Sequence, residues 1–138
     1  VRTMHTKDGY ALQHAVKKGF NIIIITGGNS NMVKKRLEGL GVKDVFLSAH
    51  KKLPLMQDYL KRNKISLNEV LYMGDDIPDL PCLKVVGVST CPNDAAVEIR
   101  EVVDYISHVN GGKGCVRDVL EQTMRVQNKW LDEDAFSW

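Results

Sequence analysis

The sequence lacks both a strong charge excess and a regular cysteine pattern, and each absence argues against certain classes of function. Its 138 residues hold 19 lysines and arginines against 17 aspartates and glutamates, giving a formal net charge of +2 at pH 7. So weak a charge, with no long basic run, argues against a nucleic-acid partner. Cys82, Cys91 and Cys115 are odd in number and show no Cys-x-x-Cys spacing. We therefore expect reduced, non-catalytic thiols in a cytoplasmic protein.

Long apolar stretches, repeats and low-complexity segments are absent as well. No apolar run approaches the length of a membrane span and no signal peptide is visible, so we expect no membrane partner. The hydrophobic content of 43% and charged content of 26% are ordinary for a globular protein. We predict one domain over residues 1–130 and a tail over 131–138. The histidines show no metal-ligand spacing and are interpreted as structural or surface residues: His5, His14, His50 and His108.

Helical and strand patterns alternate along the chain. The predicted strands lie at about 22–26, 45–47, 70–73, 85–89 and 105–107, and the predicted helices at 8–18, 31–40, 53–63, 80–84, 95–100 and 116–127. Residues 22–25 are four consecutive isoleucines without polar alternation, which is typical of a strand buried on both faces. The alternation predicts an α/β fold with three layers, α/β/α, around a parallel sheet.

Three carboxylates follow the predicted strand at 70–73 within five residues: Asp75, Asp76 and Asp79. Crowded like charges repel, and each carboxylate loses hydration where a sheet ends in a cleft. A divalent cation such as Mg²⁺ would resolve this conflict, because it takes hard oxygen ligands. Aspartates that cap the N-terminus of a helix are the alternative interpretation. The motif alone leaves both open.

A turn of Thr26, Gly27 and Gly28 ends the predicted strand at 22–26. A hydroxyl and free backbone N–H groups at a strand-to-helix turn can hold a phosphate or a similar anion. Glycine turns of this kind also occur without any ligand. The turn is therefore a candidate phosphate site that needs support from other motifs.

Two adjacent lysines, Lys51 and Lys52, stand at the start of the predicted helix at 53–63. A solvated pair is one interpretation. However, the N-terminus is the unfavourable end of a helix for cations, which suggests that one lysine is placed for an anion. Lys52, next to the apolar Leu53, is the residue we expect to have that role.

The order of these motifs resembles motifs two, three and four of the haloacid dehalogenase (HAD) phosphatase superfamily. Three further segments are similar to the 3-deoxy-manno-octulosonate 8-phosphate phosphatases: residues 5–12 ahead of the first helix, residues 86–96 with Pro92-x-Asp94-Ala95, and the Gly-Gly-Lys-Gly-Cys-Val-Arg run from Gly111 to Arg117. The resemblance covers residues 2–130 and implies a capless HAD-like fold.

The first motif of that superfamily, Asp-x-Asp-Gly, is missing from the sequence before Gly74. It supplies the nucleophile, the acid/base and two metal contacts. We therefore expect an N-terminally incomplete phosphatase whose first motif lies upstream of Val1, and we expect residues 1–138 alone to be inactive. The resemblance also implies that the missing first strand lies between the strands that end at Thr26 and Met73.

The resemblance implies Mg²⁺-dependent hydrolysis of an acidic keto-sugar phosphate through an aspartyl-phosphate, in lipopolysaccharide sugar biosynthesis. Asp75 would hold the metal, and Asp76 would be an outer ligand or would orient Lys52. Thr26, with the Gly27 amide nearby, would bind a phosphoryl oxygen, and Lys52 would offset the transferring charge. Asp79 is expected to cap a helix or to support the ligands rather than to bind the metal.

Recognition of the sugar is expected to involve neighbouring subunits, because capless members of the resembled family form homotetramers. Lys113 and Arg117 are candidates for the substrate carboxylate, and Lys7 and Asp8 for the pocket lining. Two alternatives remain. One is a phosphatase for a nine-carbon ulosonate 9-phosphate. The other is a non-catalytic HAD-like oligomerisation module, as in some cytidylyl-sialate synthetases.

Overall fold

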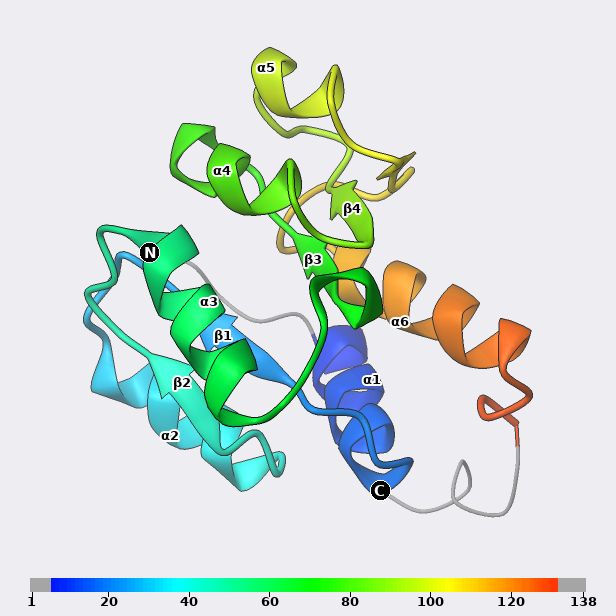
Figure 1. The fold of residues 1–138 in the computed structure, drawn as a ribbon. Helices are drawn as coiled ribbons and strands as arrows, with labels where there is room; N and C mark the ends of the chain where they lie inside the picture. Colours follow the sequence, from blue (N-terminus) through cyan, green and yellow to red (C-terminus); the bar gives the residue numbers. More distant parts are fainter. Residues whose placement is uncertain (1–5, 132–138) are drawn as a thin grey trace. The chain divides into compact units, whose positions relative to one another are not determined.

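The computed structural model describes residues 6–131, whose helices and strands are traced in Figure 1. The chain divides into two compact units, one from residues 1–48 and 112–138 and one from residues 49–111. The first unit is therefore discontinuous in sequence, because the second is inserted between its two segments.

The first unit contains a small parallel sheet and three helices. Its elements are α1 (Thr6–Lys17), β1 (Ile23–Ile25), α2 (Asn31–Gly39), β2 (Asp44–Phe46) and α6 (Cys115–Val126). β1 pairs with β2 so that Ile24 lies opposite Val45. Ser30 begins α2 by accepting a hydrogen bond from the amide of Val33 at 3.4 Å. The turn at Thr26 is thus followed at once by a capped helix.

Helices α1 and α6 come from opposite ends of the described chain and pack side by side (Figure 1). Their contact is an apolar cluster of Ala11, Ala15, Met124 and Trp130. His14 is buried beside it, and its Nε2 atom lies 3.0 Å from the carbonyl oxygens of both Lys129 and Trp130. The interpretation of His14 as a structural residue is therefore confirmed.

The isoleucine strand is less buried than the sequence predicts. All three residues of Ile23–Ile25 are half-buried. Within residues 6–131, β1 pairs with β2 alone, so one of its edges has no strand partner there. A strand with one neighbour keeps part of its surface accessible. The resemblance also implied a missing first strand, placed in the sheet between the strands that end at Thr26 and at Met73. That strand stays a prediction.

The second unit contains a three-stranded parallel sheet in the order β3-β4-β5. Its elements are α3 (Lys52–Arg62), η1 (Leu67–Glu69), β3 (Leu71–Met73), η2 (Ile77–Asp79), α4 (Leu80–Leu83), β4 (Val88–Cys91), α5 (Val97–Arg100) and β5 (Tyr105–Ile106), where η marks a 3-10 helix. Leu83, Cys91, Ala95 and Ile99 form its apolar core.

Strand β4 begins three residues later than predicted, at Val88 instead of residue 85. The amides of Val85 and Val86 bond to the carbonyl of Cys82 and so continue the turn after α4. At Gly87 the backbone lies against η1: a Cβ added to this glycine would be only 2.3 Å from the carbonyl oxygen of Asn68. Pairing with β3 begins at the next residue, Val88. The apolar run was therefore placed correctly, but its first residues belong to a turn.

The α/β class and the parallel strand pairing predicted from the sequence are confirmed. The two 3-10 helices were not predicted. Each follows an N-cap residue that accepts hydrogen bonds locally, Ser66 before η1 and Asp76 before η2. In the part of the chain that the structure describes, no helix is long and apolar enough to cross a membrane.

Candidate active site

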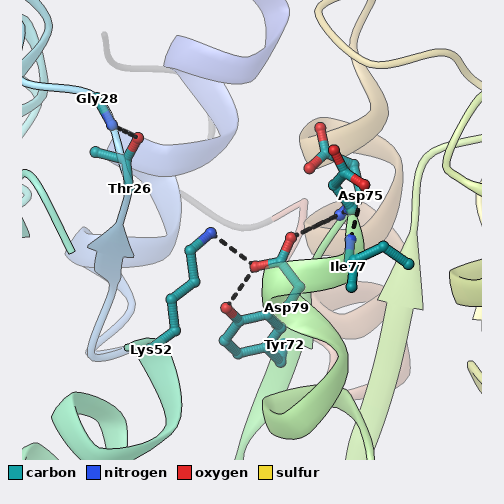
Figure 2. Close-up of polar contacts among 8 residues, drawn as sticks. Thr26, Gly28, Lys52, Tyr72, Asp75, Ile77 and Asp79 are labelled. Carbon is teal, nitrogen blue, oxygen red and sulfur yellow. Dashed lines mark hydrogen bonds and ion pairs between the residues drawn. The ribbon is translucent and has the colours of Figure 1, made fainter. Parts of the chain in front are cut away.

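The Asp79 carboxylate is the centre of a buried hydrogen-bond cluster in the second unit (Figure 2). The residue is only 3% exposed. Its Oδ1 atom accepts hydrogen bonds from Lys52 Nζ and from the Tyr72 hydroxyl, each at 2.8 Å. Its Oδ2 atom accepts from the backbone amides of Asp75 at 3.0 Å and Asp76 at 3.3 Å. Four donors therefore satisfy the acceptor positions of one carboxylate.

Gly74 allows Asp79 to occupy this position. It follows β3 directly, and a Cβ added to it would lie 2.4 Å from the Cβ and 2.7 Å from the Cγ of Asp79. The 3-10 turn then fixes the carboxylate, because the side chains of Asp76 and Asp79 each bond to the other's backbone amide. The Gly-Asp-Asp-x-x-Asp spacing therefore builds a turn that folds back on its own glycine.

Lys52 reaches this cluster from the first turn of α3, which packs against η2 and α4. The side chains of Lys52 and Asp79 are 14% and 5% exposed, so the ion pair is largely removed from water. Lys51 is the N-cap residue of the same helix and is exposed. Of the two lysines, Lys52 is thus the one turned toward the carboxylates.

Burial raises the pKa of the Asp79 carboxyl, but hydrogen bonds from Lys52 and Tyr72 outweigh it and hold the pKa below its ordinary value. Burial, followed by the adjacent Asp79 charge, raises the pKa of Tyr72 far above its usual range. At neutral pH the cluster therefore holds an ionised Asp79 and a protonated Tyr72 that acts as a hydrogen-bond donor.

Asp75 and Asp76 lie on the outer side of this cluster. Asp75 is half-buried and Asp76 is exposed. The Asp76 carboxylate accepts a hydrogen bond from the Ile77 amide at 2.7 Å, which starts η2. Of the two roles expected for Asp76, orienting Lys52 is wrong, because the ammonium is bound by Asp79. The ammonium is paired with the buried Asp79, whereas the Asp76 carboxylate caps the turn.

A metal at this site would rest on few protein ligands. Within residues 6–131, no group of three or more histidines, cysteines, aspartates and glutamates is placed to hold a metal by itself. Asp79 is already satisfied by four donors. Mg²⁺ commonly keeps several waters and binds through one or two carboxylates together with a substrate phosphate. The half-buried Asp75 fits that kind of site. The described residues do not form a cage that could bind the ion through protein ligands alone.

A hollow of about 360 Å³ lies beside the start of α3 and η2 in the second unit. Lys52 forms part of its wall. The rest of the lining is mostly apolar and consists of His50, Lys51, Leu53, Pro54, Ile77, Pro78 and Pro81. The Lys52 side chain therefore borders a concave surface within its own unit.

The turn after β1 belongs to the first unit. The Thr26 hydroxyl oxygen accepts a hydrogen bond from the Gly28 amide at 3.1 Å, as Figure 2 shows. The Thr26 amide donates to Phe46 and the Gly28 carbonyl accepts from Ser48, so the turn is held against the end of β2. A hydroxyl that accepts one bond keeps its own hydrogen as a donor. Thr26 and the exposed Gly27 can therefore offer donors to an anion.

The residues expected near the sugar also lie in the first unit. Asp8 is buried and accepts a hydrogen bond from the Arg117 amide at 2.9 Å, which places it at the N-terminus of α6. The Arg117 guanidinium bonds to Glu121 and lies over the rings of Tyr10, at 5.8 Å, and Trp130, at 5.3 Å. Arg117 is therefore already engaged in contacts within its own chain.

The structure describes the side chain of Lys113 but not that of Lys7. Lys113 is exposed in the loop before α6, between two glycines with positive φ, Gly112 at 73° and Gly114 at 107°. Such conformations favour glycine and give the loop its sharp path. Lys7 lies in α1, and its side chain is outside the described residues. Lys113 is thus more accessible than Arg117, the other candidate cation whose side chain the structure describes.

The three cysteines are free and buried. Burial raises the pKa of each thiol, which disfavours the reactive thiolate. Buried thiols with raised pKa values are suited to packing rather than to nucleophilic attack.

Sequence reasoning missed Tyr72 and the part Asp79 takes in holding Lys52. A signal was present for Asp79, because a carboxylate three residues after Asp76 satisfies the spacing of a capping box. Tyr72 carried no comparable signal, since a tyrosine in a strand is most simply explained by packing.

Comparison with known proteins gives the class of this chain. Residues 48–120, which include Lys52 and the whole carboxylate turn, match the family model described as haloacid dehalogenase-like hydrolase. The curated 3-deoxy-D-manno-octulosonate 8-phosphate phosphatase of Salmonella typhi is 32% identical over 133 residues, which cover 96% of this chain and 70% of the relative.

Solved structures agree with this match. The 3-deoxy-D-manno-octulosonate 8-phosphate phosphatase of Moraxella catarrhalis, in complex with magnesium ion, phosphate ion and KDO molecule, has a TM-score of 0.91 and is 33% identical, covering 99% of this chain and 76% of that one. The cobalt-bound phosphatase of Haemophilus influenzae has a TM-score of 0.88 at 26% identity, covering 94% and 75%. The chain belongs to the 3-deoxy-D-manno-octulosonate 8-phosphate phosphatase family of HAD-like hydrolases.

Proposed function

We propose that the full-length protein hydrolyses 3-deoxy-D-manno-octulosonate 8-phosphate through an aspartyl-phosphate, with Mg²⁺, in lipopolysaccharide sugar biosynthesis, and that this chain supplies the groups around the phosphoryl group other than the nucleophile. The observation that carries the proposal is the buried Lys52–Asp79 pair under the Asp75–Asp76 turn. A cation held on an ionised carboxylate, at the end of a strand and beside further carboxylates, suits phosphoryl transfer. The names of the relatives support the substrate.

Lys52 is the electrostatic group in this proposal. Its ammonium is fixed by Asp79 at 2.8 Å and is largely shielded from water. A preorganised cation needs no reorientation when charge develops on the transferring phosphoryl group, and its field is stronger in a dry site. Asp79 is a positioning residue in this scheme, because its oxygens are bound to donors of the protein itself.

Asp75 is the residue assigned to the metal, with Asp76 as an outer ligand. When bound, Mg²⁺ would neutralise charge between the attacking carboxylate and the phosphoryl oxygens. The chain's own contribution is to hold the Asp75 backbone: its amide donates to Asp79 Oδ2, which fixes the start of the turn. The Asp79 carboxylate thus fixes the position of the Lys52 ammonium and also that of the Asp75 backbone.

Thr26 and the Gly27 amide are assigned to a phosphoryl oxygen. The Gly28 amide fixes the Thr26 side chain by donating to its hydroxyl oxygen, so the O–H can donate outward. A hydroxyl and backbone amides at the start of a helix are suited to an anion. This role is independent of the metal.

At the sugar end, we assign the carboxylate of the substrate to Lys113, with Arg117 as a second candidate cation, and we keep Lys7 and Asp8 as candidates for the pocket lining. A homotetramer in which this loop approaches a neighbouring subunit would exclude water from a site without a cap. The exposure of Lys113 favours it as the reaching cation, whereas Arg117 would first have to leave Glu121.

The proposal can be tested by measuring phosphate release by the full-length protein after chelation, with and without added Mg²⁺. We expect the highest kcat/KM for the eight-carbon sugar acid phosphate, followed by a nine-carbon ulosonate 9-phosphate and p-nitrophenyl phosphate. A higher value for the nine-carbon compound would reassign the substrate. No release from any phosphoester would overturn the proposal and favour an oligomerisation module.

Lys113 and the assembly can be tested in the same preparation. Lys113→Ala should raise KM for the sugar acid phosphate and leave p-nitrophenyl phosphate unchanged, because only the sugar acid carries a carboxylate. Lys43→Ala, at another exposed lysine, is the matched control. Sedimentation should show a tetramer. An active monomer would contradict the expected assembly.

A further inference from the structure

Tyr72 is buried in the cluster but has no part in the mechanism above. It is the middle residue of β3, and its hydroxyl lies 2.8 Å from Asp79 Oδ1, the same oxygen that binds Lys52 (Figure 2). Strand β3 ends one residue later, so the ring is fixed by the sheet, with Tyr72 opposite Ser89 of β4. The phenol therefore reaches Asp79 from a rigid element.

We propose that Tyr72 is a positioning residue for Lys52, which shares the Asp79 carboxylate so that the ammonium keeps its charge available to the phosphoryl group. This inference rests on the proposed function for its catalytic consequence. It adds a third group to the Lys52–Asp79 pair and assigns it a role in the reaction.

The physical argument is competition for one oxygen. Asp79 Oδ1 has two donors, one charged and one neutral, at equal distances. Hydrogen bonds to an ionised carboxylate are roughly twice as strong as neutral ones, and they draw charge from the oxygen that accepts them. Without the phenol, more of the carboxylate charge would fall on Lys52. The ammonium would then be held more tightly and would offer less positive charge to a substrate.

The phenol is suited to this task because it stays a donor. Burial and the neighbouring Asp79 charge raise the pKa of Tyr72 far above its usual range, which favours the protonated hydroxyl that donates to Asp79.

The first test is kinetic and uses Tyr72→Phe in the full-length protein. Loss of one hydrogen bond to a charged group should lower kcat about tenfold and leave KM unchanged. In a Lys52→Ala background the same substitution should have no further effect on kcat, because Tyr72 acts through Lys52. Equal losses in both backgrounds would overturn the proposal. Tyr59→Phe, at another buried tyrosine of the same unit, is the control and should match the wild type.

The second test needs no activity and measures the rate at which a lysine-acylating reagent modifies Lys52, with peptide mass spectrometry. Acylation requires the neutral amine, so Lys52 should react several-fold more slowly in Tyr72→Phe than in the wild type, by the same competition for Asp79 Oδ1. The exposed Lys51 serves as the internal reference. An unchanged Lys52-to-Lys51 ratio would contradict the inference.

The two tests separate the inference from the proposed function. If the wild-type protein releases phosphate from no phosphoester, the proposed function fails, and the acylation ratio still decides whether Tyr72 controls Lys52. If the wild type is active and Tyr72→Phe has wild-type kcat, the proposed function stands and the role of Tyr72 is refuted.

Discussion

Gly74→Ala places a single methyl group against the residue on which the candidate site depends. The new Cβ would lie 2.4 Å from Asp79 Cβ, where ordinary contacts begin at 3.4 Å. One of the two groups must therefore move by about 1 Å. The Asp79 side chain cannot move that far and keep bonds of 2.8 Å to both Lys52 and Tyr72.

The expected cost has a stability part and an activity part. Overpacking a buried site usually costs about 1–3 kcal/mol, and breaking a buried ion pair costs about 3–5 kcal/mol, so we expect Gly74→Ala to lose about 3 kcal/mol of unfolding free energy. Displacing a catalytic group by about 1 Å can reduce the rate about 10²-fold. We expect a fall in kcat of that order, because Lys52 moves with Asp79.

Both quantities can be measured, by urea unfolding and by phosphate release. The matched control is Gly39→Ala at the end of α2, where an added Cβ meets nothing within 4 Å. Alanine is favoured over glycine in helices, so this control should be neutral or slightly stabilising and fully active. Wild-type stability and kcat in Gly74→Ala would refute the packing of Asp79 on Gly74.

Three further predictions concern the charged residues. Lys52→Ala should lower kcat by at least ~10²-fold while Lys51→Ala costs far less, and steady-state kinetics showing the reverse order would place the catalytic lysine one residue earlier. Asp75→Asn should abolish turnover with the fold retained by circular dichroism, so wild-type turnover with unchanged Mg²⁺ dependence would exclude Asp75 as the metal ligand. Because the pKa of Asp79 is lowered in the folded state, its stabilising effect is present above its unfolded pKa of about 3.9 and is lost as pH falls through the folded value. Urea unfolding between pH 5 and pH 2 should therefore show a smaller loss of stability for Asp79→Asn than for the wild type, and parallel curves would contradict this.

The sequence predicted the elements that local patterns control. The helix predicted to begin at residue 31 does begin at Asn31, and the parallel pairing follows from the alternation of strands and helices. Strand β4 was misplaced because Val85 and Val86 look like strand residues, and only the tertiary contact of Gly87 with Asn68 excludes them. Local apolar character cannot reveal such a contact.

The candidate site was predicted in its residue types but not in its pairing. The spacing of the carboxylates pointed to a charged turn, and Lys52 was selected over Lys51 from its place beside Leu53. Which carboxylate binds Lys52 depends on how α3 packs against η2, and the sequence holds no signal for that packing. For this reason nothing in the sequence indicated that Asp79, expected only to cap a helix or to support the ligands, is the carboxylate that binds Lys52.

The discontinuous first unit has a consequence for the order in which the chain folds. Its two segments are joined by contacts of very long sequence separation, from Asp8 to the Arg117 amide and from His14 to the carbonyls of Lys129 and Trp130. During synthesis these contacts must wait until α6 has been made, whereas residues 49–111 are contiguous and their internal contacts can form earlier. Until then the apolar face of α1 that Met124 and Trp130 cover is open to other molecules. Nascent chains that stop short of α6 should therefore be the aggregation-prone species of this protein.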